Sequence, residues 1–177
     1  MTLSFGEVSP NQRFGGRSPS MRDYKTGSIV LLQGVLADGF FKTFKPAKTT
    51  SVFVLEGRPD LSAGKGNSAA LVKKGIVPTV ICDNMAGFLF FKGLVKQVVL
   101  ACQFADKSGA LCDMGGLVLA VLAKHHNVPV QLAPAEHKAR FLGNPEDILS
   151  FEGKRTAPKG VHGYVPLVEW VPKKYLI

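Results

Sequence analysis

Cysteine, long apolar runs and acidic residues are all scarce in this chain of 177 residues. The three cysteines cannot all pair within one chain, which favours a reducing compartment. The apolar stretches are interrupted by Lys or Gly before the ~20 residues that a membrane-spanning helix needs, so we expect no membrane partner. No charged start followed by an apolar segment indicates a secretory signal. These absences together predict a cytoplasmic protein.

The shortage of acidic residues leaves the chain basic. Asp and Glu number 13 against 22 Lys and Arg, which gives a formal net charge of +9. Such an excess favours anionic partners, for example phosphate esters, RNA or an acidic protein. The basic residues are scattered along the chain, so a solvated basic surface is the plain alternative. No aromatic stacking motif lies within basic sequence, so we do not expect nucleic acid as the partner.

Length and composition indicate one domain with a loosely structured start. A chain of this length with 46% hydrophobic residues is long enough for one substantial core and too short for two ordinary ones. Residues 1–27 are rich in Ser, Gly, Pro and Arg without regular apolar spacing, and we interpret them as a poorly ordered N-terminal arm. Residues 28–177 form the predicted domain.

Short β-branched runs alternate with longer amphipathic runs after residue 27. The predicted strands are residues 28–32, 51–55, 77–81, 97–101 and 128–132, and the predicted helices are residues 35–44, 67–74, 84–94 and 113–126. This alternation predicts an α/β fold with a Rossmann-like parallel sheet flanked by helices. The last helix has Asp113 at its expected cap and Lys124 in its last turn. The tail, residues 153–177, is predicted to be extended.

In open parallel sheets, ligands bind beyond the carboxyl ends of the strands, so the residues that follow each predicted strand matter most. Those segments are residues 33–34, 56–59, 82–84, 102–103 and 133–136. They are rich in Gly, Pro, carboxylates and thiols, which makes this edge of the sheet the predicted functional site.

Two of these segments resemble motifs of a known family. Glu56-Gly57-Arg58-Pro59-Asp60-Leu61 resembles Glu-Thr-Arg-Pro-x-Leu, and Asp83-Asn84-Met85-Ala86 matches Asp-Asn-Met-Ala at an unchanged interval. Both motifs are those of the methylthioribose-1-phosphate isomerase and translation initiation factor 2B family. The closing segment of the family resembles Arg155-Thr156-Ala157-Pro158-Lys159-Gly160-Val161. The resemblance covers roughly residues 28–177, which is the carboxy-terminal α/β domain of that family.

The resemblance also implies that the family's isomerase chemistry is missing. The isomerases place a catalytic Cys where this chain has Gln33-Gly34, and a catalytic Asp where it has Cys102. Their Asn-Lys pair falls on Cys112-Asp113, and a family Gln falls on Ser62. The helical amino-terminal domain, which supplies arginines to the substrate phosphate, is expected to be absent.

The candidate site residues follow from both lines of reasoning. Asp83 and Cys102 are the candidate acid–base residues. The candidate ligand-binding residues are Glu56, Arg58, Ser62, Gly64, Asn67, Asp83, Asn84 and Asp113. Each has a structural alternative: Arg58 could form an ion pair with Glu56, and Asp83 could cap the helix that starts near Met85. The Gly-rich segment 62–68 is interpreted as a flexible loop that could cradle phosphate.

We predict no metal and no organic cofactor, because the spacing of Cys82, Cys102 and Cys112 matches no closed zinc pattern and residues 62–68 are not a Walker sequence. The resulting hypothesis is a catalytically depleted binding or assembly domain that holds a sugar phosphate or nucleotide. It would form a homo-oligomer, a dimer or larger, or a hetero-complex through residues 83–94. The alternative is an aldose–ketose isomerase of a pentose phosphate, with altered catalytic residues or completed by a partner subunit.

Overall fold

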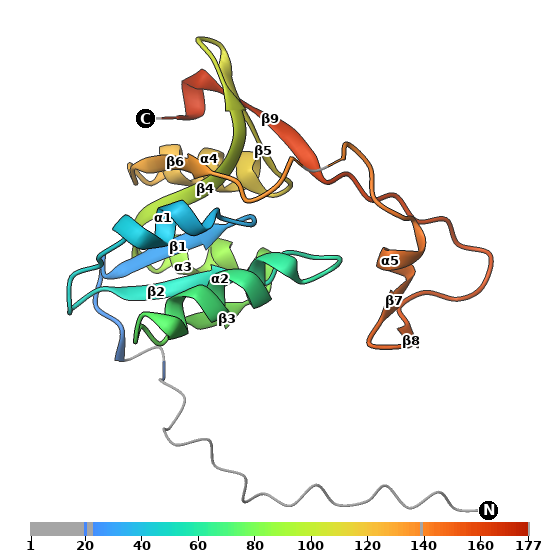
Figure 1. Cartoon of the computed structure of the whole chain (residues 1–177), viewed down its shortest axis with the longest axis horizontal. Helices are drawn as coiled ribbons and strands as arrows, with labels where there is room; N and C mark the ends of the chain where they lie inside the picture. Colours follow the sequence, from blue (N-terminus) through green and yellow to red (C-terminus); the bar gives the residue numbers. More distant parts are fainter. Residues whose placement is uncertain (1–19, 21–22, 139, 177) are drawn as a thin grey trace, which may run out of the picture.

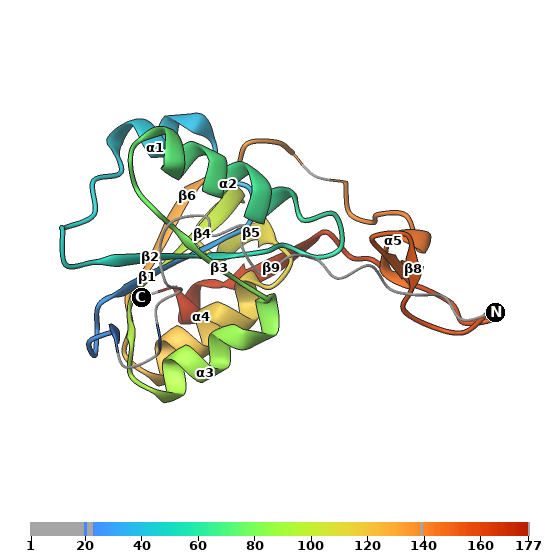
Figure 2. The same cartoon turned by 90° about the horizontal axis from the view of Figure 1, so that it is seen from below.

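The structure is a computed structural model that describes residue 20, residues 23–138 and residues 140–176. A seven-stranded sheet forms its centre, with helices on both faces (Figures 1 and 2). The strands of this sheet are β1 (Ile29–Gln33), β2 (Ser51–Leu55), β3 (Thr79–Ile81), β4 (Val95–Ala105), β5 (Gly109–Asp113), β6 (Val130–Pro134) and β9 (Val168–Pro172). The other elements are α1 (Asp38–Thr43), α2 (Ser62–Lys73), η2 (Asp83–Met85), α3 (Ala86–Phe91), α4 (Gly116–His125), α5 (Glu146–Leu149), β7 (Ser150–Phe151), β8 (Lys154–Arg155) and η3 (Lys173–Tyr175).

Five strands of the sheet run parallel, and they are the five that the alternating pattern predicts. β1 lies between β2 and β4, β3 adds to β2, and β6 adds to the other side of β4. Their apolar runs are continuous because helices cover both faces, which leaves Ile29 and Val54 without exposed surface. The predicted α/β fold is therefore confirmed.

Two apolar layers hold the helices to the sheet. α1 and α2 cover one face, with Phe40 and Leu71 packed on Val30 and Val54 (Figure 2). α3 and α4 cover the opposite face, where Phe90 is 1% exposed. Burying such side chains contributes ~1.5–3 kcal/mol each, so these layers account for much of the stability.

The sheet also contains two antiparallel strands that the pattern did not predict. β4 turns back into β5 through a tight hairpin, in which Asp106 Oδ1 accepts hydrogen bonds from the backbone N–H groups of Ser108 and Gly109. β9 then pairs antiparallel with β5, so part of the predicted extended tail completes the sheet. The turn signal is visible in Asp106-Lys107-Ser108-Gly109, but the predicted strand ended at residue 101 and the predicted helix began at residue 113.

Two of the differences between predicted and observed helix starts change the roles of residues. α2 begins at Ser62, five residues before the predicted start, so the glycines of the segment 62–68 lie inside a helix and not in a flexible loop. α4 begins at Gly116, and Asp113 ends β5 instead of capping this helix. Glu169 takes the capping role, because its Oε1 accepts hydrogen bonds from the amides of Gly115 and Leu117.

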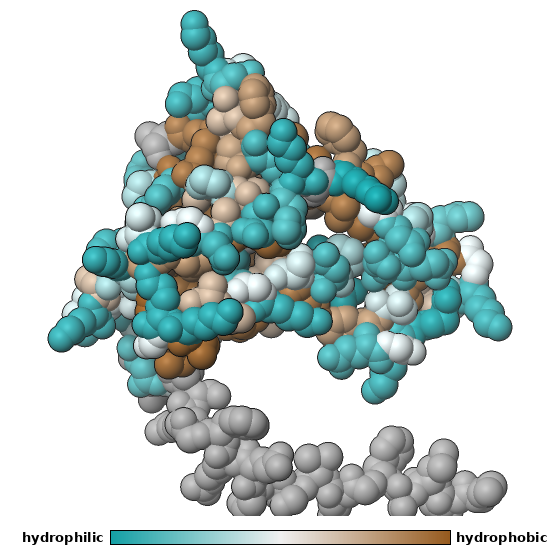
Figure 3. All heavy atoms as spheres, in the orientation of Figure 1, coloured by the Kyte–Doolittle hydropathy of each residue, from teal (hydrophilic) through white to brown (hydrophobic). Residues whose placement is uncertain are grey.

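The rest of the chain adds one excursion and few further elements. Between β6 and β9 the chain leaves the sheet, forms α5 and the β7–β8 hairpin, and returns (Figure 1). Hydrophilic residues cover much of this excursion, and the face of the molecule is hollowed between it and the sheet (Figure 3). Most of the predicted arm, residues 1–19, 21 and 22, lies outside the described residues. No helix within the described ranges is long and apolar enough to cross a membrane.

Candidate functional site

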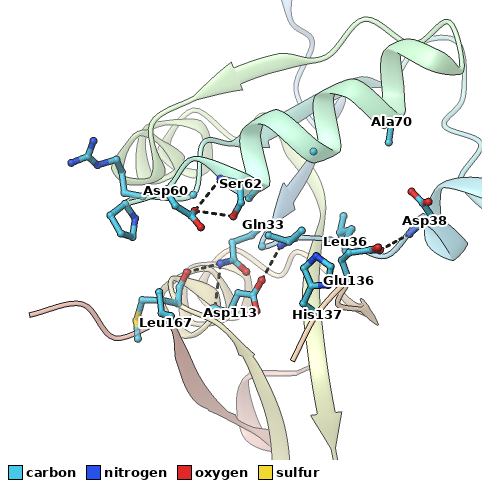
Figure 4. A pocket seen from close by; sticks show the side chains of 18 of the residues that line it. Gln33, Leu36, Asp38, Asp60, Ser62, Ala70, Asp113, Glu136, His137 and Leu167 are labelled. Atoms are coloured by element: carbon cyan, nitrogen blue, oxygen red, sulfur yellow. Dashed lines mark hydrogen bonds between the residues drawn. The ribbon is translucent and has the colours of Figure 1, made fainter. Parts of the chain in front are cut away.

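A cavity of about 540 Å³ lies at the carboxyl ends of β1 and β2 (Figure 4). Its walls come from the loop after β1, residues 33–36, from the turn after β2, residues 57–60, and from the first turns of α2. Asp113 and Met114, Glu136 and His137, and Pro166 and Leu167 close the remaining sides. The crevice thus lies where open parallel sheets bind ligands, as the sequence predicts.

The loop after β1 is fixed from both sides. Gly34 has φ +76°, and a Cβ there would lie 2.7 Å from both Ala101 Cβ and Asp113 Oδ2. Asn67, which is buried in α2, donates from Nδ2 to the Gly34 carbonyl oxygen and accepts at Oδ1 from the Leu36 amide. Asn67 therefore shapes the loop from behind and does not line the cavity.

Gln33, at the end of β1, forms part of the cavity wall and is 4% exposed. Its Nε2 donates to the carbonyl oxygens of Asp113 and Met114, at 3.2 and 2.6 Å. Two carbonyl acceptors fix the orientation of the amide, which leaves its Oε1 as the acceptor. Within the described residues this buried oxygen has no hydrogen-bond partner.

The turn after β2 is tied to the end of β3 by Asp83. Its Oδ1 accepts a hydrogen bond from the Gly57 amide at 3.0 Å, and its Oδ2 accepts one from the Arg58 amide at 2.9 Å. The sequence alternative of a helix cap at Asp83 is therefore wrong, since both of its oxygens accept from the turn after β2 and the N-cap positions of η2 and α3 are Cys82 and Met85. The Asp83 carboxylate thus ties the turn after β2 to the residue that follows β3.

Arg58 lines the cavity but points its charge at the C-terminal excursion. Its guanidinium carbon lies 4.4 Å from the ring centroid of Phe151 in β7. Arg58 and Glu56, both described, form no ion pair, so the structural alternative proposed for this pair is wrong. A cation over an aromatic face is stabilised by the ring quadrupole, which gives Arg58 a partner outside the cavity.

The start of α2 is organised by Asp60. Its Oδ1 accepts hydrogen bonds from the amide and the hydroxyl of Ser62, at 3.0 and 2.8 Å. One turn further on, the Gly64 amide donates to the Glu56 carbonyl oxygen, and a Cβ on Gly64 would lie 3.0 Å from the Glu56 backbone. Gly64 therefore allows α2 to approach β2 closely, while Ser62 lines the cavity.

Asp113 is the carboxylate that lies deepest in the crevice. Its Oδ2 accepts from the Val35 amide at 2.8 Å, and its Oδ1 accepts from Gln103 Nε2 at 3.0 Å. Burial raises the pKa of the Asp113 carboxyl above its ordinary value, although both hydrogen bonds lower it, and the negative charge of Asp60 raises it further. The pKa of the Asp113 carboxyl, which lines the cavity, is thus raised mainly by burial.

The candidate thiols lie outside the cavity. Cys102 on β4 lies opposite Cys112 on the antiparallel strand β5, and the Cys102 Sγ donates to the Phe104 carbonyl oxygen. Burial raises the pKa of the Cys102 thiol, and it raises that of Cys112 to about 12. Desolvation and the neighbouring Glu56 carboxylate raise the pKa of the Cys82 thiol. No cluster in the described ranges has the side chains to hold a metal ion.

The structure therefore divides the candidate residues into three groups. Arg58, Ser62 and Asp113 line the cavity, whereas Asn67, Gly64, Asp83 and Glu56 support its walls. Cys102 lies on β4 outside the cavity, and Asn84 is exposed on η2. The sequence prediction did not commit to Gln33, Asp38, Asp60, Glu136 or His137, all of which line the cavity. All of these except Asp38 lie in or beside the strand-end segments, so closer inspection of these segments could have included them.

Comparisons with known proteins agree on one family. A family described as "Initiation factor 2 subunit family" matches residues 29–177. A methylthioribose-1-phosphate isomerase of Thermus thermophilus is 30% identical over 155 residues, which cover 81% of this chain and 47% of the relative. The isomerase of Thermotoga petrophila is 29% identical over 189 residues, covering 91% and 53%. This chain thus spans about half the length of the curated relatives that it matches.

Two solved structures share the fold. Translation initiation factor eIF-2B subunit delta from A. fulgidus has a TM-score of 0.70 and 22% identity, and the match covers 86% of this chain and 51% of that one. The 5-methylthioribose 1-phosphate isomerase from Pyrococcus horikoshii OT3 also has a TM-score of 0.70, with 21% identity and coverages of 84% and 48%.

Proposed function

Since the chain belongs to the initiation factor 2 subunit family, we propose that it is a member without isomerase activity that acts as a binding or assembly domain. The observation that carries this proposal is the state of its candidate acid–base groups. Aldose–ketose isomerisation needs an acid and a base within hydrogen-bond reach of adjacent carbons. Neither candidate for these roles, Asp83 or Cys102, meets that requirement.

Asp83 is committed to the backbone. Both of its oxygens accept amide hydrogen bonds from the turn after β2, and the side chain is not part of the cavity wall. A carboxylate that withdrew from this role to transfer a proton would leave two loop amides without acceptors, at a cost of ~1–3 kcal/mol each. This role supports a positioning function for Asp83.

Cys102 is an unsuitable base for a different reason. A thiol acts as a base or nucleophile only as the thiolate, and the raised pKa of Cys102 keeps it protonated at neutral pH. Its Sγ also faces the Phe104 carbonyl oxygen and Cys112 instead of the crevice. The position that resemblance assigns to a catalytic carboxylate therefore holds an inert group.

The crevice remains the proposed binding site. A sugar phosphate or nucleotide is the ligand class that the family resemblance implies, and its sugar hydroxyls would donate hydrogen bonds to Asp60 and Asp113. Among the described residues that line the cavity, Arg58 is the only Lys or Arg. Binding of a phosphate would therefore depend on Arg58 leaving the ring of Phe151.

The proposed assembly surface lies on the opposite layer. Phe88 and Phe91 on α3 are 49% and 75% exposed, and Met85 is exposed beside them on η2. Val118 is also exposed, on α4, which covers the same face of the sheet as α3 (Figure 2). Exposed apolar residues grouped in this way are typical of protein interfaces, which supports a homo-oligomer or hetero-complex.

Isomerase activity is the direct test of the proposal. Purified protein is incubated with methylthioribose-1-phosphate, with the Thermus thermophilus isomerase as positive control, and the ketose product is measured. We expect no conversion. Turnover near ~1 per second, which is ordinary for an enzyme, would overturn the proposal.

One observation favours the alternative of an isomerase with altered catalytic residues. Asp113 lines the cavity, and its raised pKa brings its carboxyl group closer to the range useful for proton transfer. If the assay above shows turnover, Asp113→Asn should remove it while the fold is retained. Turnover that survives this substitution would exclude Asp113 as the acid–base group.

A further inference from the structure

Two of the three cysteines of this chain lie directly opposite each other in the sheet. Cys102 on β4 and Cys112 on β5 are Cα partners in an antiparallel pair of strands. Directly opposite residues in such a pair have Cα atoms about 4.5 or 5.5 Å apart, and disulfide bonds join Cα atoms about 4.4–6.8 Å apart. The backbone of β4 and β5 therefore already has the spacing that a disulfide bond requires.

The two side chains also project to the same face of the sheet. Cys112 is a buried member of the apolar layer under α3 and α4, and Cys102 packs against that layer. The thiols are in contact, since the Cys112 thiol donates a hydrogen bond to the Cys102 sulfur. Cys82 follows β3, which β2 and β1 separate from β4, a distance of three strand spacings of ~4.8 Å. Cys102 and Cys112 are thus the pair that the fold allows.

The surroundings distinguish the two thiols. Burial raises the pKa of both. The charge of a Cys102 thiolate and the hydrogen bond between the sulfurs raise the pKa of Cys112 further, to about 12, whereas this hydrogen bond lowers the pKa of Cys102. Cys102 is also partly exposed, and Cys112 has no exposed surface. A reagent in solution therefore reaches Cys102 first, and Cys112 is the thiol that completes a bond.

The raised pKa of Cys102 makes it an unsuitable base but does not prevent thiol–disulfide exchange. Exchange passes through the small fraction of thiolate that is present at any pH, so burial slows it without removing the oxidised state. Cys102 is thus inert in proton transfer at neutral pH and still open to slow exchange.

We propose that Cys102 and Cys112 form a reversible disulfide bond, which makes this pair a redox modification site. The oxidant is a low-molecular-weight disulfide of the glutathione class. The Cys102 thiolate attacks one sulfur of this disulfide and forms a mixed disulfide, and the released thiolate takes up the proton that Cys102 lost. Cys112 then loses its proton and attacks the Cys102 sulfur, which releases the second small thiol. Two protein thiols are oxidised, and one small disulfide is reduced to two thiols.

The bond would connect the redox state of the protein to the wall of the crevice. Gln103 and Asp113 follow the two cysteines along the chain, and Gln103 Nε2 donates to Asp113 Oδ1 at 3.0 Å. Asp113 lines the cavity. A covalent link one residue earlier on each strand fixes the spacing of β4 and β5 here, so oxidation would hold the Asp113 side of the cavity in place. The proposed bond itself does not depend on the proposed function.

A redox titration of the full chain tests the inference. Cys82→Ser protein, which retains only the opposed pair, is equilibrated without denaturant for a day at about pH 8, where more thiolate is present, in mixtures of reduced and oxidised glutathione. It is then quenched with acid, alkylated and measured by intact mass spectrometry. We expect both thiols to be lost together, with a mass lower by two hydrogens before alkylation.

The dependence on reduced glutathione identifies the kind of bond. At constant oxidised glutathione, halving the reduced form should raise the ratio of oxidised to reduced protein about fourfold, because each protein disulfide releases two small thiols. A mixed disulfide releases one, so its ratio rises only about twofold. Cys112→Ala in the same background leaves Cys102 alone, and any oxidation of this variant should show the twofold dependence.

The possible results all bear on the proposed bond. No loss of thiols from Cys82→Ser protein, or a twofold dependence in place of the fourfold one, would overturn it. In the parent chain, peptide mapping that finds Cys82 linked to Cys102 or Cys112 would also overturn it, because that pairing requires the sheet to unfold. The proposed lack of isomerase activity is decided by its own assay on the reduced protein, so the two can fail separately.

Discussion

Asp83 and Arg58 are joined through the backbone and not through their charges: Asp83 Oδ2 accepts the hydrogen bond of the Arg58 amide at 2.9 Å. The Arg58 guanidinium is directed to Phe151 instead. Two residues that lie in the motifs most similar to the isomerases thus act together to shape a turn beside the crevice. Because this structural role accounts for both residues, their presence is not by itself evidence of catalysis.

Loss of the Asp83 carboxylate should destabilise the protein. In Asp83→Ala two loop amides lose their acceptors, so we expect the free energy of unfolding to fall by ~1–3 kcal/mol in urea denaturation. Asn84→Ala is the matched control, because Asn84 is the exposed neighbour of Asp83 and its loss should change the free energy of unfolding by less than ~0.5 kcal/mol. Equal effects of the two substitutions would contradict the positioning role of Asp83.

Gly34 should be intolerant of a side chain. In Gly34→Ala the new Cβ meets Ala101 and Asp113 at 2.7 Å in a left-handed backbone conformation, so we expect a loss of more than ~1 kcal/mol. Gly39 in α1 has no atom within 4 Å of its Cβ position, and Gly39→Ala should stabilise the helix by ~0.5–1 kcal/mol. Chemical denaturation of both variants measures the difference. A neutral Gly34→Ala would show that the loop after β1 can shift.

The raised pKa of Asp113 predicts a pH dependence of stability. Between the ordinary carboxyl pKa and the raised one, the folded state binds more protons than the unfolded state, so the contribution of Asp113 to stability falls as pH rises through this window. Asp113→Asn removes the ionisation and keeps a carbonyl oxygen for the Val35 amide. The difference in melting temperature, variant minus parent, should therefore increase from about pH 4 to pH 7. A difference that decreases over this range would show that the hydrogen bonds outweigh burial.

The apolar surface of α3 should mediate association. We expect a dimer or larger closed assembly by light scattering at roughly tens of micromolar, a concentration at which a specific apolar interface persists. Phe91→Asp should reduce the mass to that of the monomer, because a buried unpaired charge is costly. Val72→Asp is the control, since Val72 is 61% exposed on α2 in the opposite layer. A monomeric parent protein at this concentration would contradict the interface.

Sequence reasoning placed the candidate site at the carboxyl edge of the sheet, where the cavity lies, but assigned several roles wrongly. Of its candidate residues, Arg58, Ser62 and Asp113 line the cavity. It interpreted the segment 62–68 as a loop, because its glycines have low helix propensity, whereas the fold holds it in α2. Tertiary packing against β2 overrides the local preference there, and Gly64 is required for the close approach.

What the sequence by itself determined is the alternation of strands and helices, the parallel part of the sheet and the family. These follow from apolar spacing and from short motifs, which are properties of neighbouring residues. Only the tertiary structure decided that Glu169 caps α4, that Asp83 holds the turn after β2, and that four carboxylates surround the crevice. The physical reason is that a carboxylate accepts a hydrogen bond from whichever donor the fold brings near it. For Glu169 that donor lies 54 residues away along the chain, beyond the reach of any local pattern.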